Sequence, residues 1–279
     1  MIVDAHQHFW DLTRADYGWL TPEAGVLSRN YLPSEVEPIL RESEVAATVL
    51  VQAAPSEAET HYLLGLARAH PFVAGVVGWV DFAAADAPRR IAALAQAGGE
   101  KLKGLRPMVQ DIAAPDWIAQ PSLDSAFDAV IAHDLTFDAL VRPIHLEPLR
   151  TRLLRHPKLR AVLDHAGKPD IARGGLAAWA RDLKRLARET PILCKLSGLL
   201  TEAGKRRSID DLEPYVADVF ASFGPDRVMW GSDWPVLNSV STYADWLNLS
   251  GELIQRFASG RDADVLAKNA IRFYRLTLH

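Results

Sequence analysis

Short β-branched and apolar runs alternate with longer stretches of helical periodicity along the whole chain, and this alternation constrains the fold more than any other feature. The runs predict strands at Ile2–His6, Ala46–Gln52, Val73–Trp79, Leu102–Arg106, Leu135–Val141, Arg160–Asp164, Ile192–Leu196 and Arg227–Gly231. The periodicity predicts helices at Glu57–His70, Ala87–Ala97, Leu123–His133, His145–Arg155, Leu176–Glu189, Leu212–Phe223, Tyr243–Phe257 and Ala263–Leu276. Strands that alternate with helices in this way form right-handed βαβ units around a parallel sheet.

The number of these units favours a closed barrel over an open sheet. Eight predicted strands match the strand count of a β/α barrel, and 279 residues suit one such domain. A doubly wound sheet is the alternative, but the chain lacks the early Gly-rich phosphate turn of its dinucleotide-binding versions. We therefore expect a single-domain (β/α)8 barrel of the TIM type over residues 1–279.

Charge and composition exclude several classes of partner. The net charge is −4 with basic and acidic residues intermixed, which argues against nucleic acid. Cys194 is the single cysteine, so no internal disulfide can form, and this fits a reducing compartment. The N-terminus lacks the pattern of a signal peptide, and no apolar run approaches the roughly 20 residues of a membrane helix. We expect a cytoplasmic monomer or homo-oligomer that acts on a small molecule.

The first predicted strand runs into the motif Asp4-Ala5-His6-Gln7-His8. Because strand side chains alternate, Asp4, His6 and His8 are expected on one face, which is the lumen at a barrel mouth. Two imidazoles about 7 Å apart along a strand can converge on one metal ion or one water. The simpler alternative is a pair of polar residues at a strand end.

Two further strand ends carry groups suited to hydrolysis. Asp233 follows the last predicted strand in Gly-Ser-Asp-Trp-Pro, where a carboxylate can bind a metal or accept a proton from water. A turn aspartate is the alternative there. His165 follows Asp164 at the sixth strand end, as a ligand, a general acid or a structural histidine. Asp164 and His165 have opposite parity, so only one of them faces the lumen unless the strand has already ended.

Candidate substrate contacts are Arg106, Lys195, Trp10 and Trp234. Arg106 at the fourth strand end can hold a carboxylate or a carbonyl oxygen, although a rim salt bridge is equally consistent with its position. Lys195 interrupts an apolar strand, where a lysine is unfavourable unless it is paired, so a luminal role is expected. The two tryptophans adjoin the predicted rim, and aromatic faces suit sugar rings as well as ordinary packing. The long segment 9–31 is a candidate lid.

Taken together, the motifs HQHFW, KGLRP, VLDHAGKP and GSDWP resemble the amidohydrolase superfamily. The resemblance is to its amidohydrolase-2 branch and, within that, to the sugar-lactonase-like group of L-fuconolactonases and L-rhamnonolactonases. Pyrone-dicarboxylate lactonases and sulfomuconolactone hydrolases are relatives of this group. The resemblance spans the whole chain and implies that His6, His8, His165 and Asp233 form the catalytic centre.

The predicted fifth strand departs from the pattern of the binuclear members. Those members carry a histidine on that strand, whereas Leu135–Val141 has none and His145 lies beyond it. A two-metal centre is therefore not expected. The resemblance leaves two options open, namely one divalent ion, zinc by preference, on His6, His8 and Asp233, or catalysis by side chains alone.

The resemblance and the reduced centre favour a lactonase that opens the ring of an aldonic or related sugar-acid lactone. A lactone ester needs less electrophilic activation than an amide, so water attack with Asp233 as the base, and with His165 or a metal stabilising the oxyanion, is the expected mechanism. A hydrolase or decarboxylase of aromatic-derived acids, or of a muconolactone or pyrone lactone, is the alternative enzyme. A non-catalytic barrel that binds a small molecule is the alternative of another class.

Overall fold

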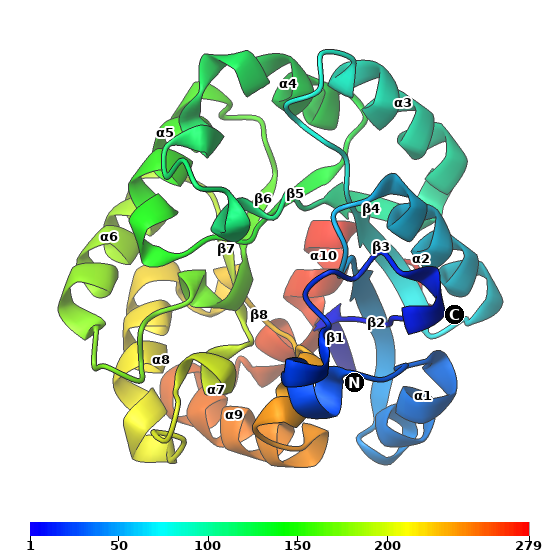
Figure 1. The fold of residues 1–279 in the computed structure, drawn as a ribbon. Helices are drawn as coiled ribbons and strands as arrows, with labels where there is room; N and C mark the ends of the chain where they lie inside the picture. Colours follow the sequence, from blue (N-terminus) through cyan, green and yellow to red (C-terminus); the bar gives the residue numbers. More distant parts are fainter. Residues whose placement is uncertain (279) are drawn as a thin grey trace.

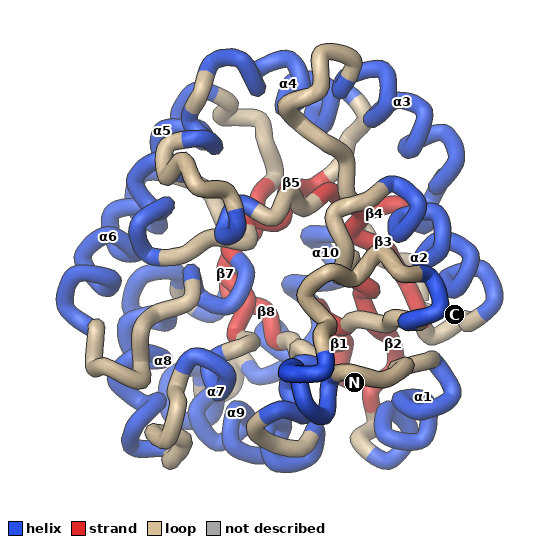
Figure 2. The backbone as a smooth tube through the Cα atoms, in the orientation of Figure 1, coloured by secondary structure: helices blue, strands red, loops and turns tan. Residues whose placement is uncertain are grey.

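A computed structural model describes residues 1–278 and confirms the expected β/α barrel. Within those residues, eight parallel strands follow one another in sequence order around a single sheet. The strands are β1 Ile2–Gln7, β2 Val45–Val51, β3 Val73–Gly78, β4 Leu102–Leu105, β5 Thr136–Ala139, β6 Ala161–Leu163, β7 Leu193–Leu196 and β8 Val228–Trp230. Figure 2 shows them as a central ring with most of the helices outside it.

All the helices except the last surround this ring in the order of the sequence (Figure 1). The helices are α1 Pro33–Glu42, α2 Glu57–Ala69, α3 Ala87–Gly98, α4 Asp124–Ala132, α5 Leu146–Arg155, α6 Leu176–Glu189, α7 Leu199–Glu202, α8 Ile209–Phe223, α9 Tyr243–Ala258 and α10 Asn269–Tyr274. Periodicity alone does not predict α1, which contains Pro38, or α7, which has only four residues. Ser56 and Thr242 cap α2 and α9 by accepting backbone N–H groups of the first turn.

The ring closes between its first and last strands. Gln7 bridges in parallel to Trp234, just beyond the end of β8. The amide of Asp233 donates to the carbonyl of His6 at 2.8 Å, and the amide of His8 donates to the carbonyl of Trp234 at 2.7 Å. The carboxyl ends of β1 and β8 are thereby held side by side.

The C-terminal segment closes the opposite end of the barrel, where the strands begin. Phe273 and Tyr274 of α10 join a buried cluster with side chains of β1, β2 and β3, and α10 crosses the centre of the ring in Figure 1. Asn269 donates to the carbonyl of Val228, at the start of β8. Entry to the lumen is therefore left to the end where the strands finish, which is the end that carries function in this fold.

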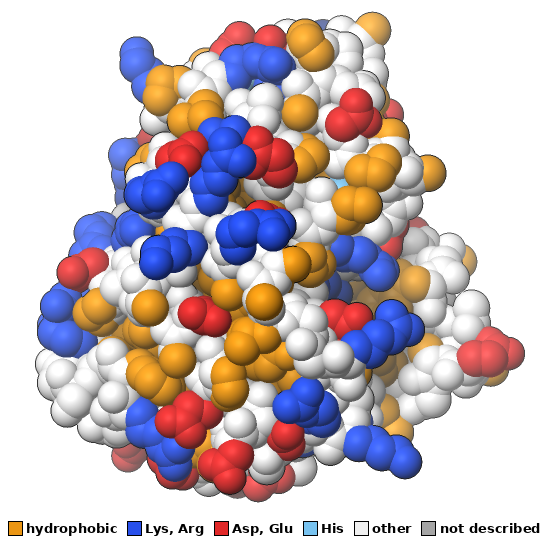
Figure 3. Space-filling view, turned by 90° about the vertical axis from the view of Figure 1, so that its left-hand side faces the viewer, with side chains coloured by type: hydrophobic (Ala, Val, Ile, Leu, Met, Phe, Trp, Pro, Cys, Tyr) orange, Lys and Arg blue, Asp and Glu red, His pale blue; other side chains and the backbone are white. Residues whose placement is uncertain are grey.

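Segment 9–31 is folded rather than extended. It contains short 3-10 turns at Leu12–Arg14 and Pro22–Leu27, and its ends pair through an antiparallel bridge between Trp10 and Tyr31. On the barrel side formed by α5, α6 and α8, basic and acidic side chains are interspersed (Figure 3), in keeping with the small net charge. Among the described residues, no helix combines the length and the apolarity needed to cross a membrane.

Tyr274→Phe tests how firmly the C-terminal helix is tied to the barrel interior. The Tyr274 hydroxyl donates to the buried carboxylate of Asp138 at 2.6 Å, so its loss removes a hydrogen bond to a charged buried group. We expect the free energy of unfolding in urea to fall by about 1–3 kcal/mol. Tyr62→Phe, at a half-buried ring on α2, is the matched control and should change it little. Equal effects of the two variants would contradict this account of the helix.

Candidate functional site

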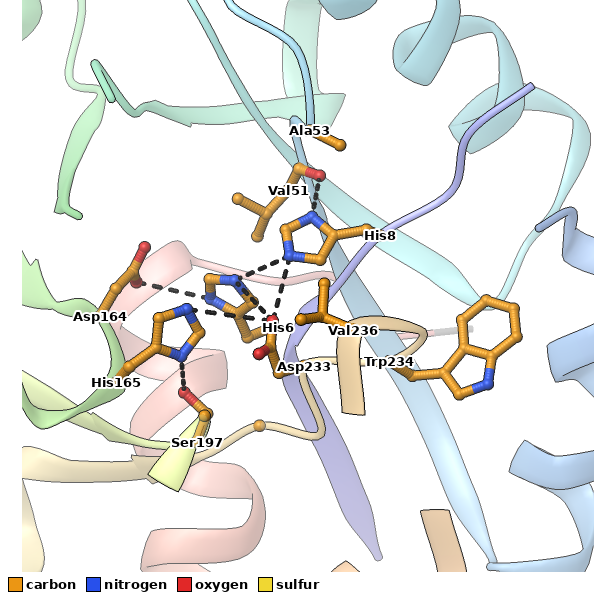
Figure 4. A network of polar contacts seen from close by, with 12 residues as sticks. His6, His8, Val51, Ala53, Asp164, His165, Ser197, Asp233, Trp234 and Val236 are labelled. Atoms are coloured by element: carbon orange, nitrogen blue, oxygen red, sulfur yellow. Dashed lines mark hydrogen bonds and ion pairs between the residues drawn. The ribbon is translucent and has the colours of Figure 1, made fainter. Parts of the chain in front are cut away.

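A single carboxylate oxygen lies at the centre of the barrel mouth. Oδ1 of Asp233 is 3.3 Å from Nε2 of His8, 3.7 Å from Nε2 of His6 and 3.9 Å from Nε2 of His165. All four side chains are buried, with at most 4% of any residue exposed. Figure 4 shows the three rings directed at the carboxylate from β1 and from the loops after β1 and β6. The structure thus brings together the four residues that the sequence indicates as the catalytic centre.

The rings of His8 and His165 each make a further hydrogen bond through Nδ1. Nδ1 of His8 lies 2.8 Å from the carbonyl of Val51 and must donate to it, because a carbonyl only accepts. Nε2 of His8 is directed into the centre, 3.2 Å from Nε2 of His6 and 3.3 Å from Oδ1 of Asp233. Nδ1 of His165 pairs with the Ser197 hydroxyl at 2.9 Å. These contacts fix the ring orientations, as outer-shell partners do for metal-binding histidines.

Burial sets the charge state of the centre. It lowers the pKa of His165 to about 4. Together with the nearby Lys195 ammonium, burial also holds the pKa of His6 well below its usual range. For Asp233 burial alone would raise the pKa, but the surrounding histidines outweigh it and lower the pKa below the usual range. At neutral pH the site therefore presents an ionised carboxylate beside neutral His6 and His165.

These residues also fit a divalent ion. One ligand atom each from His6, His165 and Asp233 lie within 4.8 Å of one another. Neutral imidazole nitrogen and carboxylate oxygen are the donors that zinc takes in catalytic sites. His8 faces the same carboxylate at 3.3 Å, so the set expected from the sequence, His6, His8 and Asp233, is together as well, with His165 added to it.

A layer of buried charges lies directly beneath the centre. Nζ of Lys195 is 2.6 Å from Asp138, 3.0 Å from Asp164 and 3.1 Å from Nδ1 of His6. Arg106 pairs with Asp164 at 3.2 Å. Burial opposes ionisation of Asp164, but Lys195, His6 and Arg106 together hold its pKa well below the usual range. Lys195 is therefore luminal, as the sequence predicts. It contacts His6, however, and does not line the cavity above the centre, where a substrate contact was expected.

The centre forms the floor of a cavity of about 350 Å³. Arg106, His8, His165 and Asp233 line this cavity, so Arg106 can reach a bound molecule. This volume lies within the range of small-molecule sites. Further wall residues that sequence patterns do not single out are Trp19, Gln110, Lys168, Thr201 and Glu202.

The two tryptophans expected at the substrate do not line this cavity. Trp10 is fully buried, packs edge-to-face on Tyr31 at 5.3 Å and donates its indole N–H to the carbonyl of Arg29. Trp234 also packs on Tyr31 and points away from the histidines in Figure 4. The prediction that Trp10 and Trp234 contact the substrate is therefore wrong. Both rings instead hold segment 9–31 against the barrel. Trp19 is the tryptophan on the cavity wall, and it donates to the carbonyl of Ala53 at 2.7 Å.

The alternation of side chains along a strand does not apply where the backbone is irregular, and this decides the outcome at Asp164 and His165 and at Asp4. Strand β6 ends at Leu163, so Asp164 and His165 lie in a turn and both point inward, as the parity rule allows once the strand has ended. For Asp4 the expectation is wrong. The register of β1 is irregular between Asp4 and Gln7, and Asp4 accepts from the Tyr243 hydroxyl on α9 instead of facing the lumen.

The chain matches a known protein family over nearly its whole length. The family model described as amidohydrolase covers residues 3–276. The chain belongs to the amidohydrolase family. This amidohydrolase is 46% identical over 279 residues to an L-fucono-1,5-lactonase of Burkholderia ambifaria. The match covers 98% of this chain and 95% of that protein. An L-fucono-1,5-lactonase of Burkholderia multivorans is 36% identical over 270 residues, covering 93% of this chain and 89% of that protein.

A solved structure agrees with the architecture. The crystal structure of an amidohydrolase from Burkholderia multivorans with bound zinc matches with a TM-score of 0.92 and 34% identity, covering 99% of this chain and 100% of that one. Together with the family match, this confirms the resemblance inferred from the four sequence motifs and the barrel inferred from the alternation of strands and helices.

Asp4→Asn gives a pH-dependent test of the clamp between β1 and α9. In the folded protein burial raises the pKa of Asp4 to about 6, whereas an aspartate in the unfolded chain titrates near 3.8. The folded state thus binds more protons between these values, so wild-type stability falls as pH rises from about 4 to about 6. Relative to wild type, the variant should gain about 2–3 kcal/mol between pH 4 and pH 7.5. Urea unfolding at both pH values measures this, and a pH-independent difference would refute it.

Proposed function

We propose that this amidohydrolase hydrolyses the ester bond of sugar-acid lactones, with L-fucono-1,5-lactone and related aldonolactones as the substrate class. The curated relatives of 46% and 36% identity, both L-fucono-1,5-lactonases, support this proposal. The observation that carries it is the ionised Asp233 carboxylate on the cavity floor, with Nε2 atoms of three histidines between 3.3 and 3.9 Å from its Oδ1.

Asp233 serves as the proton carrier in this proposal. A water molecule held by the carboxylate and the histidines gives one proton to Asp233 while its oxygen forms a bond to the lactone carbonyl carbon. The ring C–O bond then breaks, and Asp233 returns that proton to the ring oxygen, which becomes a hydroxyl group. The carboxylic acid that forms loses its remaining proton to solvent, so each turnover releases one proton.

The developing oxyanion needs a donor on the cavity wall. Arg106 lines the cavity, and its Nη1 lies 3.4 Å from Nε2 of His6, so a carbonyl oxygen above the centre is within reach of this fixed cation. His165 is the second candidate donor. A cation held in advance by Asp164 and Gln52 stabilises the oxyanion without having to reorganise during the reaction.

A bound divalent ion would be held by His6, His165 and Asp233, with His8 beside them, and would supply Lewis-acid activation of the water or the carbonyl. The bound zinc of the amidohydrolase from Burkholderia multivorans supports zinc as that ion.

The mixed charge of the cavity favours a polyhydroxylated ring over a dicarboxylate. Arg106 and Lys168 are its cationic groups, whereas Asp111 and Glu202 are acidic and would repel a second carboxylate of the substrate. Neutral hydroxyl groups can pair with residues of either sign. We therefore place the neutral sugar lactones ahead of the pyrone and muconolactone alternatives.

Asp233→Asn tests the mechanism. In a pH-indicator screen of aldonolactones we expect proton release by the wild type, and a fall in kcat of at least about 100-fold in the variant, because an amide cannot accept the proton of water. Asp182→Asn, at a partly exposed position of α6 outside the cavity, is the matched control and should keep wild-type activity. Full activity of the Asp233 variant would overturn the mechanism, and a wild type that opens no lactone would overturn the function.

Elemental analysis of the purified protein tests the size of the metal centre. Because β5, Thr136–Ala139, carries no histidine, we expect no more than one divalent ion per chain, and its loss in a His165→Ala variant. Two ions per chain, or an ion retained by that variant, would contradict the assigned ligands.

A further inference from the structure

The turn that carries His165 also places a lysine over the cavity. His165, Ala166, Gly167 and Lys168 all have left-handed backbone conformations, with φ of 53°, 51°, 71° and 53°. Consecutive non-glycine residues in this region are unfavourable and persist only where the surrounding structure holds them. Because of this turn, His165 lies at the floor of the cavity and Lys168 forms part of its wall.

Lys168 faces a carboxylate from the neighbouring β/α unit. Its Nζ lies 3.3 Å from Oε1 of Glu202, the last residue of α7, and the two side chains are 21% and 28% exposed. Both residues line the cavity together with His165 and Asp233. They also line an adjoining cavity of about 650 Å³ that contains Arg173, so the pair stands at the boundary between the two spaces.

Partial exposure gives this ion pair little weight in the stability of the fold. The two side chains are better suited to binding a polar ligand than to stabilising the fold. An ammonium offers only donors and a carboxylate only acceptors, whereas every sugar hydroxyl is both a donor and an acceptor. Two neighbouring hydroxyls can therefore bind one to Lys168 and one to Glu202, and hydrogen bonds to charged groups are the stronger kind.

We propose that Lys168 and Glu202 are the specificity-determining residues of this site and bind two adjacent hydroxyl groups of the lactone ring while its carbonyl lies at Asp233. This inference rests on the proposed lactonase function and names the groups that distinguish a sugar lactone from an unsubstituted one. The 3.3 Å contact between the two side chains pairs their opposite charges with each other at the cavity wall.

Steady-state kinetics of Lys168→Met and Glu202→Gln on the best aldonolactone of the screen test this assignment. Each variant should raise KM by about tenfold or more with kcat within about threefold of wild type, because the lost contacts hold the ring and not the reacting atoms. Arg173→Gln, which alters the adjoining cavity only, is the matched control and should leave both constants unchanged. An unchanged KM in both variants, or a loss confined to kcat, would overturn the proposal.

Binding of two unreactive lactam rings distinguishes a substrate contact from a merely structural role of Lys168 and Glu202. By calorimetry, the wild type should bind gluconolactam at least about tenfold more tightly than δ-valerolactam, which lacks the hydroxyls, and both variants should lose this preference. Equal binding of the two lactams by the wild type, or an equal loss for both lactams in the variants, would refute the assignment. A wild type that opens no lactone would instead refute the proposed function, so the two failures can be told apart.

Discussion

Closure of the sheet between β1 and β8 is the constraint on which the rest of the molecule depends. Two backbone hydrogen bonds, from Asp233 to His6 and from His8 to Trp234, join residues more than 220 positions apart in the chain. In an open sheet the two histidines and the aspartate would lie on opposite edges. The same closure that completes the barrel therefore also brings His6, His8 and Asp233 together.

The charge layer below the centre is the second determinant of its geometry. Lys195 contacts Asp138, Asp164 and the inner nitrogen of His6, so the ring that faces Asp233 is held from behind. Buried ion pairs of this kind add little net stability, because desolvation offsets their attraction, but they restrict the arrangements that the interior can adopt. Tyr274 extends this layer to the C-terminal helix through its bond to Asp138.

The sequence contains most of this arrangement in the form of strand ends. Alternating strands and helices predict the barrel, and polar residues at its strand ends predict His6, His8, His165 and Asp233. The prediction fails where the backbone leaves ideal geometry. Asp4 faces α9 because the register of β1 is irregular, and no periodicity marks the left-handed turn or the four-residue α7 that bring the wall residues together. Aromatic residues near a rim are also ambiguous, since sequence alone cannot separate packing rings from substrate contacts.

The connection between the first and last strands has a consequence for synthesis on the ribosome. Strand β1 leaves the ribosome before the other seven strands, yet the backbone groups on one of its edges meet their partners only after residues 228–234 have been made. Until then the nascent chain presents an unpaired parallel edge that another chain could occupy. Contacts of such long sequence separation are also slow to form, because the entropy of closing the loop must be overcome first. The histidines at the end of β1 and the carboxylate of Asp233 thus come together only in the final stage of folding.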